Sequence, residues 1–221
     1  VGSGVHGDFE SALVWGVDGT HMMVRVPTSE RAESEQSADL IALRALSQGV
    51  RTRLPFGVPS FLGQVPVGGT RAVVYGYVPG EKVSLFEMDG LGSLSGSLAE
   101  SIAAVHSLPT SVIADAGLPV FTAPELLRST VSVMDRASET GLVPAALLSR
   151  WEQATEDSAL WQFAPTVVNG ALSAESFLTD GERVTGVLGW QGLSVGDPAR
   201  DLFWVLPNEV AADAVFGAYH R

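Results

Sequence analysis

The sequence predicts an α+β fold with two lobes, a small lobe built on an antiparallel sheet and a larger, mainly helical lobe. In the first part of the chain, short β-rich segments surround one stretch of helical periodicity. The composition changes at Pro79-Gly80, and helical patterns then dominate until short β-rich segments return after Pro165. We therefore assign residues 1–80 to a small N-terminal lobe and residues 81–221 to a larger C-terminal lobe.

Composition limits the classes of protein to which the chain can belong. Hydrophobic residues make up 46% of its 221 residues, which is enough for one mid-sized domain or two small lobes. A net charge of −12 repels nucleic-acid phosphates and anionic membranes, so we expect neither as a partner. No apolar run approaches the roughly 20 residues of a membrane helix. We expect a cytoplasmic protein that binds a small molecule or a protein partner.

Cysteine and histidine usage excludes further kinds of site. The chain has no cysteine, and therefore no disulfide, thiolate nucleophile or cysteine-based metal site. Its four histidines show no metal-ligand spacing, which argues against a zinc enzyme. Apart from Lys82 every basic side chain is arginine, and together with abundant Ala, Val and Gly this is typical of a GC-rich bacterial genome.

The N-terminal lobe is expected to begin with a β-hairpin. Ser11–Val17 and His21–Val26 are rich in Val, Met and Ala, which favour strands. Asp18-Gly19 lies between them and is a strong turn signal.

A helix and two more strands complete the predicted small lobe. Thr28 and Ser29 offer N-caps, and the helix is expected to end before Gly49. Extended segments follow at 58–63 and 71–78, separated by a turn rich in Pro and Gly. The apolar residues that recur at helical spacing are Leu40, Ile41, Leu43 and Leu46.

Three helices are predicted at the beginning of the C-terminal lobe. The first ends before Pro109. Pro124 and Pro144 lie near the first turns of two further helices, at 123–139 and 144–160, where proline is favoured. The apolar positions of the first helix are Leu94, Leu98, Ile102 and Val105.

Short strands and two more helices are predicted in the remainder of the chain. The strands are expected at 166–168, 177–179 and 184–190. Asp197-Pro198 predicts the start of a helix, because Asp is a good cap and Pro suits the first helical position. A last helix is expected at about 208–219.

Three segments of the second half carry the functional signal. They read NGALSAESFL over 169–178, VLGW over 187–190 and VGDPARDL over 195–202. This arrangement resembles the catalytic core of the aminoglycoside and macrolide phosphotransferases, which are small-molecule kinases with a bilobal protein-kinase-like fold. The family pattern is H-G-D-x-x-x-x-N, then an apolar strand ending in D-W, then G-D-P-x-x-D. The resemblance implies this fold for nearly the whole chain.

The spacing of the family pattern is kept here, but its catalytic groups are replaced. Ser176 follows Ala171 by five positions, and Gly189 follows Ser176 by thirteen, as the pattern requires. Ala171 stands where the family has its catalytic Asp, and Asn169 stands where a His precedes it. Ser176 replaces the metal-binding Asn, and Gly189 replaces the metal-binding Asp of the D-W pair.

These replacements predict a degenerate catalytic loop at 169–178 and a degenerate metal-site strand at 184–190. A positioned base contributes about 10²–10⁴-fold to the rate, and Ala171 cannot act as one. Mg²⁺ requires carboxylate oxygens that these positions no longer supply, so its binding is not expected. The favoured hypothesis is a pseudokinase that binds ATP or GTP, another small ligand or a protein partner.

A divergent but active phosphotransferase is the alternative. It would act on a hydroxylated antibiotic, sugar or metabolite through unusual groups such as Glu175, Ser173 or Asp197. Glu175 is the one carboxylate left inside the loop, and it could serve as a relocated acid–base group or metal ligand. Its position in the loop, however, indicates a side chain that points outward.

The resemblance also implies a nucleotide site on the N-terminal lobe. Arg25 lies on the strand where the family places a basic residue for the α- and β-phosphates. Asp39 best matches the helix carboxylate that pairs with it, and Glu35 is the alternative. An Arg25–Asp39 pair is equally compatible with a purely structural ion pair. Tyr77 and Val78, in the strand-to-hinge passage, are the other residues expected beside a nucleotide.

Other residues are expected to have structural roles. His106, on the apolar face of a helix, is predicted to be a hydrogen-bonded core histidine. In the family, the residues matching Asp197 and Asp201 cap the following helix and brace the catalytic loop. Trp190 and Trp204 are predicted to pack in the core.

Two further features are weak signals for phosphate binding. Gly2-Ser3-Gly4 and Gly7 fit a phosphate-covering loop, but glycines near a terminus are common. Lys82 is a cation, but it lies past the hinge and is badly placed to hold phosphates.

Overall fold

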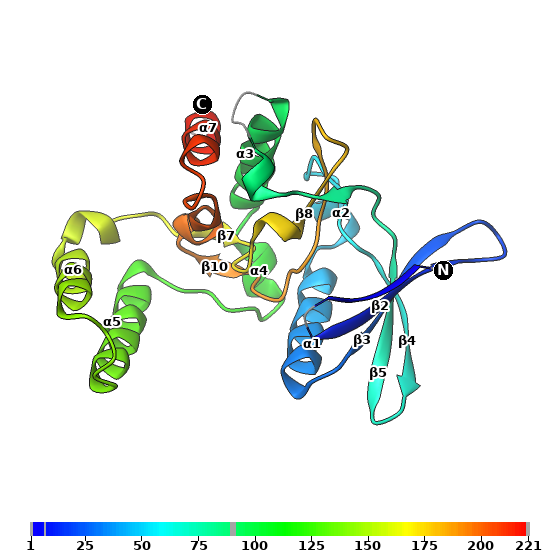
Figure 1. The fold of residues 1–221 in the computed structure, drawn as a ribbon, viewed down its shortest axis with the longest axis horizontal. Helices are drawn as coiled ribbons and strands as arrows, with labels where there is room; N and C mark the ends of the chain where they lie inside the picture. The colour runs from blue at the N-terminus through cyan, green and yellow to red at the C-terminus, as the bar shows by residue number, and fades with distance from the viewer. Residues whose placement is uncertain (1, 7, 89–91, 220–221) are drawn as a thin grey trace.

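The computed structural model describes residues 2–6, 8–88 and 92–219, with side chains from Asp8 onward. Its N-terminal part is a five-stranded antiparallel sheet with strand order β1-β2-β3-β5-β4 and one long helix, α1, on one side (Figure 1). The predicted small antiparallel lobe is therefore confirmed. The strands are β1 (Gly2–His6), β2 (Phe9–Trp15), β3 (His21–Pro27), β4 (Phe61–Val67) and β5 (Thr70–Gly76).

The predicted hairpin is formed by β2 and β3, which pair from Phe9↔Pro27 to Trp15↔His21. The connecting loop is longer than a two-residue turn and spans residues 16–20. Asp18 Oδ1 accepts a hydrogen bond from the backbone N–H of Thr20 at 3.0 Å, and Gly19 takes the left-handed φ of +84° that the loop requires.

Helix α1 (Glu30–Ala45) begins where the sequence predicts, because the Ser29 side chain accepts a hydrogen bond from the N–H of Ala32. A short helix, α2 (Gln48–Arg51), follows. The strand expected at 58–63 instead occupies 61–67. The segment before it leaves the sheet, because Gly57 exchanges backbone hydrogen bonds with Thr185 and Val187 in the second half of the chain.

The C-terminal part is mainly helical and carries two small sheets, β6-β8-β9 and β7-β10. It also contains α4, which follows Pro109 and was not predicted. Its helices are α3 (Ser93–His106), α4 (Ser111–Asp115), α5 (Ala123–Glu139), α6 (Ala145–Glu156) and α7 (Glu209–Tyr219), with 3₁₀ turns η1 (Leu85–Glu87), η2 (Ser158–Trp161), η3 (Ala174–Ser176), η4 (Pro198–Asp201) and η5 (Phe203–Val205). Its strands are β6 (Glu81–Lys82), β7 (Thr166–Val168), β8 (Phe177–Thr179), β9 (Val184–Val187) and β10 (Ser194–Gly196).

Three predicted elements end differently in the structure. The strand expected at 184–190 stops at Val187, because Gly189 has a φ of +72° and turns the chain. The helix expected at 144–160 stops at Glu156, and Asp157 then caps a separate 3₁₀ turn. The helix expected after Asp197-Pro198 is replaced by η4 and η5, with tight bonds such as Leu202 N–H to Ala199 O at 3.1 Å.

One continuous core joins the sheet, α1 and the C-terminal elements. Leu98 and Ile102 of α3 are fully buried, and α3 packs along α7. Trp190 is also fully buried and stacks on Phe56, with ring centroids 6.4 Å apart, so its predicted packing role is confirmed. Because this core spans both parts of the chain, the boundary at residue 80 stays a prediction.

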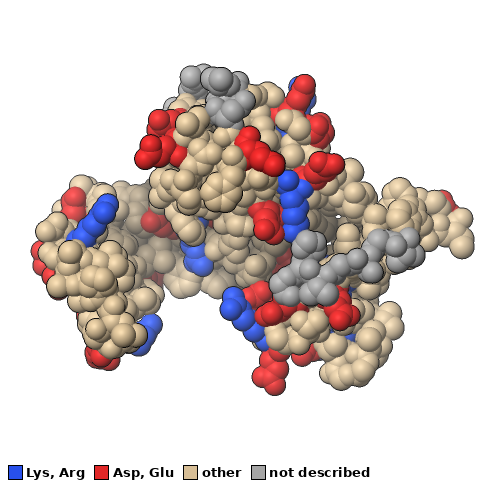
Figure 2. Space-filling view, viewed as in Figure 1, with Lys and Arg blue, Asp and Glu red and all other residues tan. Residues whose placement is uncertain are grey.

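Helices α5 and α6 stand apart from this core (Figure 1). Thr122 and Glu125 form a reciprocal capping box that begins α5, as the position of Pro124 also favours. Ala123 is the only buried residue of the two helices. Among the described helices, none combines the length and the apolar character that crossing a membrane would require. Acidic side chains are scattered over the face of the molecule seen in Figure 2.

We expect Ile102→Ala to lower the free energy of unfolding by about 2–5 kcal/mol, because it leaves a cavity in the centre of the core. Val133→Ala on α5, where the side chain is 53% exposed, should change it by no more than about 0.5 kcal/mol. Urea unfolding of both variants measures the difference. Equal losses would show that α5 is as well packed as α3.

Candidate functional site

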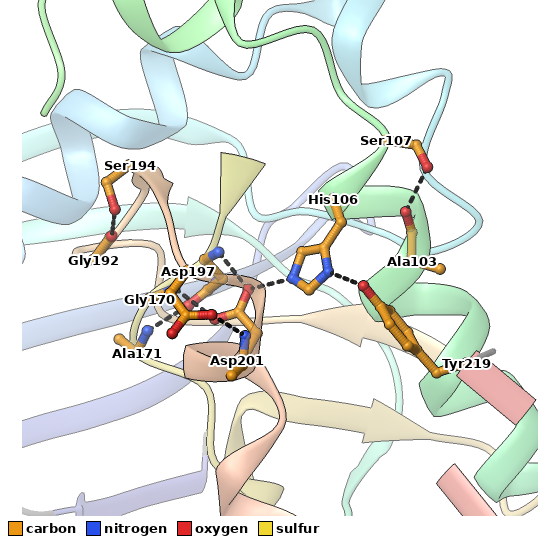
Figure 3. A network of polar contacts seen from close by, with 12 residues as sticks. Ala103, His106, Ser107, Gly170, Ala171, Gly192, Ser194, Asp197, Asp201 and Tyr219 are labelled. Carbon is orange, nitrogen blue, oxygen red and sulfur yellow. Dashed lines mark hydrogen bonds and ion pairs between the residues drawn. The ribbon is translucent and has the colours of Figure 1, made fainter. Parts of the chain in front are cut away.

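The loop at 169–171 is hydrogen-bonded to one buried carboxylate, that of Asp201 (Figure 3). The backbone N–H of Asn169 donates to Asp201 Oδ2 and that of Gly170 donates to Asp201 Oδ1, each at 2.7 Å. Asp201 is fully buried, so both bonds lie in a low-dielectric environment where each is strong. The bracing role expected for Asp201 is present in the structure. Asp197 likewise caps the turn that presents it, by accepting from Ala199 N–H at 2.9 Å.

His106 and Tyr219 continue this network away from the loop (Figure 3). His106 Nε2 lies 3.3 Å from Asp201 Oδ2, and its Nδ1 lies 2.7 Å from the Tyr219 hydroxyl. Burial, with a further contribution from the Asp201 charge, raises the pKa of Tyr219. His106 is thus a hydrogen-bonded core histidine, as predicted, and it connects α3 and α7 to the loop.

Two glycines allow the 169–171 loop to touch the loop after β9. Gly170 has a φ of +76°, and a Cβ placed on it would lie 2.3 Å from the carbonyl oxygen of Gly192. A Cβ on Gly192 would lie 2.7 Å from the carbonyl carbon of Gly170. Backbone therefore packs directly on backbone here, and neither position tolerates a side chain.

Asn169 joins the same two loops through its side chain. Its Nδ2 donates to the carbonyl oxygen of Gly189 at 3.0 Å, and its Oδ1 accepts from the N–H of Ala171 at 3.1 Å. Asn169 is fully buried, so these bonds satisfy both ends of its amide. The sequence marked this position only as a lost histidine, whereas the structure shows that its amide links the catalytic-loop and metal-strand positions.

Ser176 and Gly189, the positions where the resemblance places the family's metal ligands, offer no carboxylate in the structure. The Ser176 hydroxyl accepts from the N–H of Ser173 at 3.1 Å and lies 3.3 Å from the Ser173 hydroxyl, so it caps a 3₁₀ turn. Gly189 has no side chain, and the space beside it holds Gln191, whose Oε1 would lie 3.3 Å from an added Cβ. Nowhere among the described residues do three His, Asp or Glu side chains gather closely enough to hold a metal ion. The donors present do not fit a hard divalent cation.

Glu175 lies at the surface and pairs with Lys82. The Lys82 ammonium is 3.1 Å from Glu175 Oε2, and the Glu175 side chain is 74% exposed. The outward orientation that its loop position suggests is therefore observed. The pair joins β6 to η3, and Lys82 lies past the hinge, as the sequence indicates.

On the N-terminal lobe, Asp39 of α1 reaches the turn after β9. Its Oδ1 accepts a hydrogen bond from the backbone N–H of Trp190 at 2.7 Å. Burial raises the pKa of Asp39, and this effect is partly opposed by the Trp190 N–H and by the charge of Arg25. Glu35, the alternative carboxylate, instead pairs with Arg31 on the exposed side of the helix.

The Arg25–Asp39 contact differs from the direct ion pair considered from the sequence. Within the part of the chain that the structure describes, no ion pair within 4.0 Å joins them. The Arg25 guanidinium instead lies over the Phe9 ring, 4.0 Å from its centroid. The positive charge of Arg25 therefore lowers the pKa of Asp39 through space, without a hydrogen bond between the two side chains.

Tyr75 was not predicted from the sequence as part of this site. It is buried beside Asp39, and burial, followed by the Asp39 charge, raises the pKa of its phenol strongly. Its hydroxyl makes no hydrogen bond of good geometry with any described residue. Strand pairing could have identified it, because Tyr75 pairs with Met23, two residues before Arg25, and so lies on the same face of the sheet.

The hinge region lies beside a cavity with a volume of about 750 Å³. Tyr77 and Lys82 line it, together with the turn after β8. Neither the 169–171 loop nor Gly189 reaches it. The Val78 side chain points elsewhere, against Gly57 and Gly186, where a Cβ on Gly186 would lie 2.4 Å from Val78 Cγ1. The glycines at 2–4 lie within β1, and Gly7 lies outside the described residues.

A family model described as "Phosphotransferase enzyme family" matches residues 2–220, which is nearly the whole chain. The chain belongs to this family. The expected resemblance is therefore confirmed.

Known structures with the same fold include two antibiotic kinases. Macrolide 2'-phosphotransferase MphH from Brachybacterium faecium is 22% identical, with a TM-score of 0.81 over 99% of this chain and 75% of its own. APH(2")-IIia, in a complex with GDP and kanamycin, is 20% identical, with a TM-score of 0.78 over 100% of this chain and 77% of its own. Both confirm the bilobal kinase-like fold of this family member.

A curated relative in Bacillus subtilis (strain 168), named as the uncharacterized protein YcbJ, is 25% identical over 202 residues. These residues are 88% of this chain, and the chain spans 65% of the length of that relative.

We expect Asp201→Ala to destabilise the protein strongly, because the substitution leaves two buried N–H groups without an acceptor, at about 1–3 kcal/mol each. Asp201→Asn retains one acceptor and should have a smaller effect. Asp213→Ala, an exposed position on α7, is the control, and urea unfolding is the measurement. A loss for Asp201→Ala no larger than the control's would show that the loop does not depend on this carboxylate.

The raised pKa of Asp39 predicts a pH dependence of stability. Because the folded protein holds this proton more tightly than the unfolded chain, the contribution is present below the ordinary Asp pKa and is lost as pH rises through the raised value. The free energy of unfolding of the native protein, measured relative to Asp39→Asn, should therefore fall as the pH rises above about 4. A difference that stays constant or rises over this range would contradict the assignment.

Proposed function

We propose that this member of the phosphotransferase enzyme family binds a nucleotide, another small ligand or a protein partner without transferring phosphate. The observation that carries the proposal is the identity of three residues: Ala171, Ser176 and Gly189 stand where the family places its base and its two metal ligands. The family's spacing aligns them with these roles, the Ser176 hydroxyl caps a 3₁₀ turn, and Gly189 has no side chain.

Phosphoryl transfer depends on charge stabilisation at the γ-phosphate and on an oriented acceptor hydroxyl. Neither a base nor a metal clamp is available from the residues named above. The loss of the base alone corresponds to about 10²–10⁴-fold in rate. Loss of the metal clamp removes several further kcal/mol of transition-state stabilisation.

Features that would bind a nucleotide are nevertheless retained. Arg25 supplies a cation on the face of the sheet that lies toward α1, and it is pre-oriented by Phe9. The backbone N–H and C=O of Val78 form no hydrogen bond with any described residue, which leaves a donor and an acceptor at the hinge for a nucleobase. Solved structures of this fold include complexes with GDP, ADP or ATP. We propose binding of ATP or GTP that does not require Mg²⁺.

Glu175 is the group on which a divergent active enzyme would depend. Its carboxylate is exposed and pairs with Lys82, which favours a structural role over acid–base chemistry. Its contribution can be measured directly.

Calorimetry with ATP and GTP, with and without Mg²⁺, tests the proposal. We expect binding that does not change when the metal is removed, and no phosphate release or transfer above background. A ligand at about 100 times its Kd should stabilise the protein by about 2.7 kcal/mol, which thermal unfolding detects. Turnover that requires Mg²⁺ and is lost in Glu175→Gln would overturn the proposal.

The converse test restores the family's groups. Ala171→Asp, Ser176→Asn and Gly189→Asp together should give Mg²⁺-dependent nucleotide hydrolysis above that of the native protein. Asp tolerates the left-handed φ at Gly189 better than most residues, and Gln191 can move aside. Ser173→Asp is the matched control, since it adds a carboxylate to the same loop at a position that the family does not use.

A further inference from the structure

The carboxamide of Gln191 lies over Gly189, in the loop that follows β9. A Cβ added to Gly189 would lie 3.3 Å from Gln191 Oε1 and 3.9 Å from Gln191 Nε2. The amide therefore occupies the space into which a side chain at position 189 would extend. Because the family's spacing puts a metal ligand at position 189, a neutral amide stands where a carboxylate and its metal ion would be.

Several hydrogen-bond donors of this loop have no acceptor in the described chain. Gln191 is exposed, and its side chain makes no hydrogen bond with any described residue. The backbone N–H groups of Gly189 and Gln191 likewise donate to none of them. The N–H of Trp190, which lies between the two, donates to Asp39 Oδ1 at 2.7 Å. The loop therefore presents donors to a bound molecule, and two of them are the N–H groups of Gln191 Nε2.

The surroundings of this loop suit a phosphate group without a metal ion. Segments 169–174 and 184–196 contain no charged residue, although the chain has a net charge of −12. Asp39 and Asp201 reach these segments from outside, but both are buried and accept backbone N–H groups. A carboxylate next to a phosphate requires a metal ion between them, because the like charges repel each other at short distance. Neither segment has a carboxylate that a metal ion would have to separate from a phosphate.

We propose that Gln191 binds a phosphate group of the nucleotide directly, in place of a metal ion. The inference rests on the nucleotide binding proposed above, and it identifies the residue that makes this binding independent of Mg²⁺. A carboxamide N–H donates to an anionic oxygen in a charge-assisted hydrogen bond, which is among the stronger kinds. The carboxamide oxygen alone is a poor substitute for the carboxylates that hold Mg²⁺. The chemistry of Gln191 therefore favours contact with a phosphate over contact with a metal.

Asp39 connects Gln191 with Arg25, the cation expected to hold phosphates. Its Oδ1 accepts the N–H of Trp190, the residue before Gln191, and the Arg25 charge acts on the same carboxyl through space. Arg25 on the sheet and Gln191 on the loop after β9 thus lie near one buried side chain. A ligand with two or more phosphate groups offers an oxygen to each of them, which a nucleoside cannot do.

Calorimetry of Gln191 variants in EDTA tests the inference, with ATP or GTP, whichever the native protein binds more tightly. Gln191→Ala should weaken nucleotide binding about tenfold, because a hydrogen bond to a charged group is lost. Binding of the matching nucleoside, which has no phosphate, should not change. Gln153→Ala, at an exposed position of α6, is the control and should bind the nucleotide as the native protein does.

Gln191→Glu gives a readout that a merely structural role would not move. The variant keeps the shape of the side chain but places a carboxylate against the phosphates, so binding in EDTA should weaken more than in Gln191→Ala. Added Mg²⁺ should then strengthen binding about tenfold or more, while binding by the native protein should change less than about twofold. Thermal unfolding without nucleotide checks that each variant folds.

The possible results distinguish this inference from the proposed function. A native protein that binds neither ATP nor GTP would overturn both, and so would nucleotide binding that requires Mg²⁺. Unchanged binding by Gln191→Ala, or a Gln191→Glu variant that gains no response to Mg²⁺, would overturn the role of Gln191 alone. Equal weakening of nucleotide and nucleoside binding would also overturn this role, since it would show that Gln191 does not act on the phosphates.

Discussion

The carboxylate of Asp201 is the group on which the arrangement of the site depends. It receives two backbone N–H groups from the catalytic-loop position and lies against His106, which reaches Tyr219 on α7. Because it is fully buried, any change in its hydrogen bonds would leave polar groups without partners. The path of the 169–171 loop is therefore fixed by Asp201 and does not depend on the side chain at position 171.

The contacts that shape the candidate site involve mainly backbone groups. Gly170 and Gly192 allow two loops to pack backbone on backbone, and the amide of Asn169 joins them. Ala171 and Gly189 lie within the same loops and carry no polar side-chain atom. The two loops therefore hold their arrangement without a polar side chain at either position.

The two parts of the molecule are coupled through a contact that involves no metal and no catalytic group. Asp39 on α1 holds the backbone of Trp190, and Trp190 stacks on Phe56, so the helix and the turn after β9 are held in register. The face of the sheet that lies toward α1 therefore belongs to the site.

The amino-acid sequence by itself determined the features that depend on neighbouring residues: the β2–β3 hairpin around Asp18-Gly19, the start of α1 at Ser29, and the motif spacing that identified the family. The features that only the tertiary structure decided all depend on residues far apart in the chain. Asp39 reaches Trp190 across 151 positions, and Gly57 draws its segment out of the predicted strand to pair with β9. Local periodicity and capping are set by interactions within a few residues. Long-range pairs form only when packing brings two elements together, and the sequence of neither segment alone specifies that geometry.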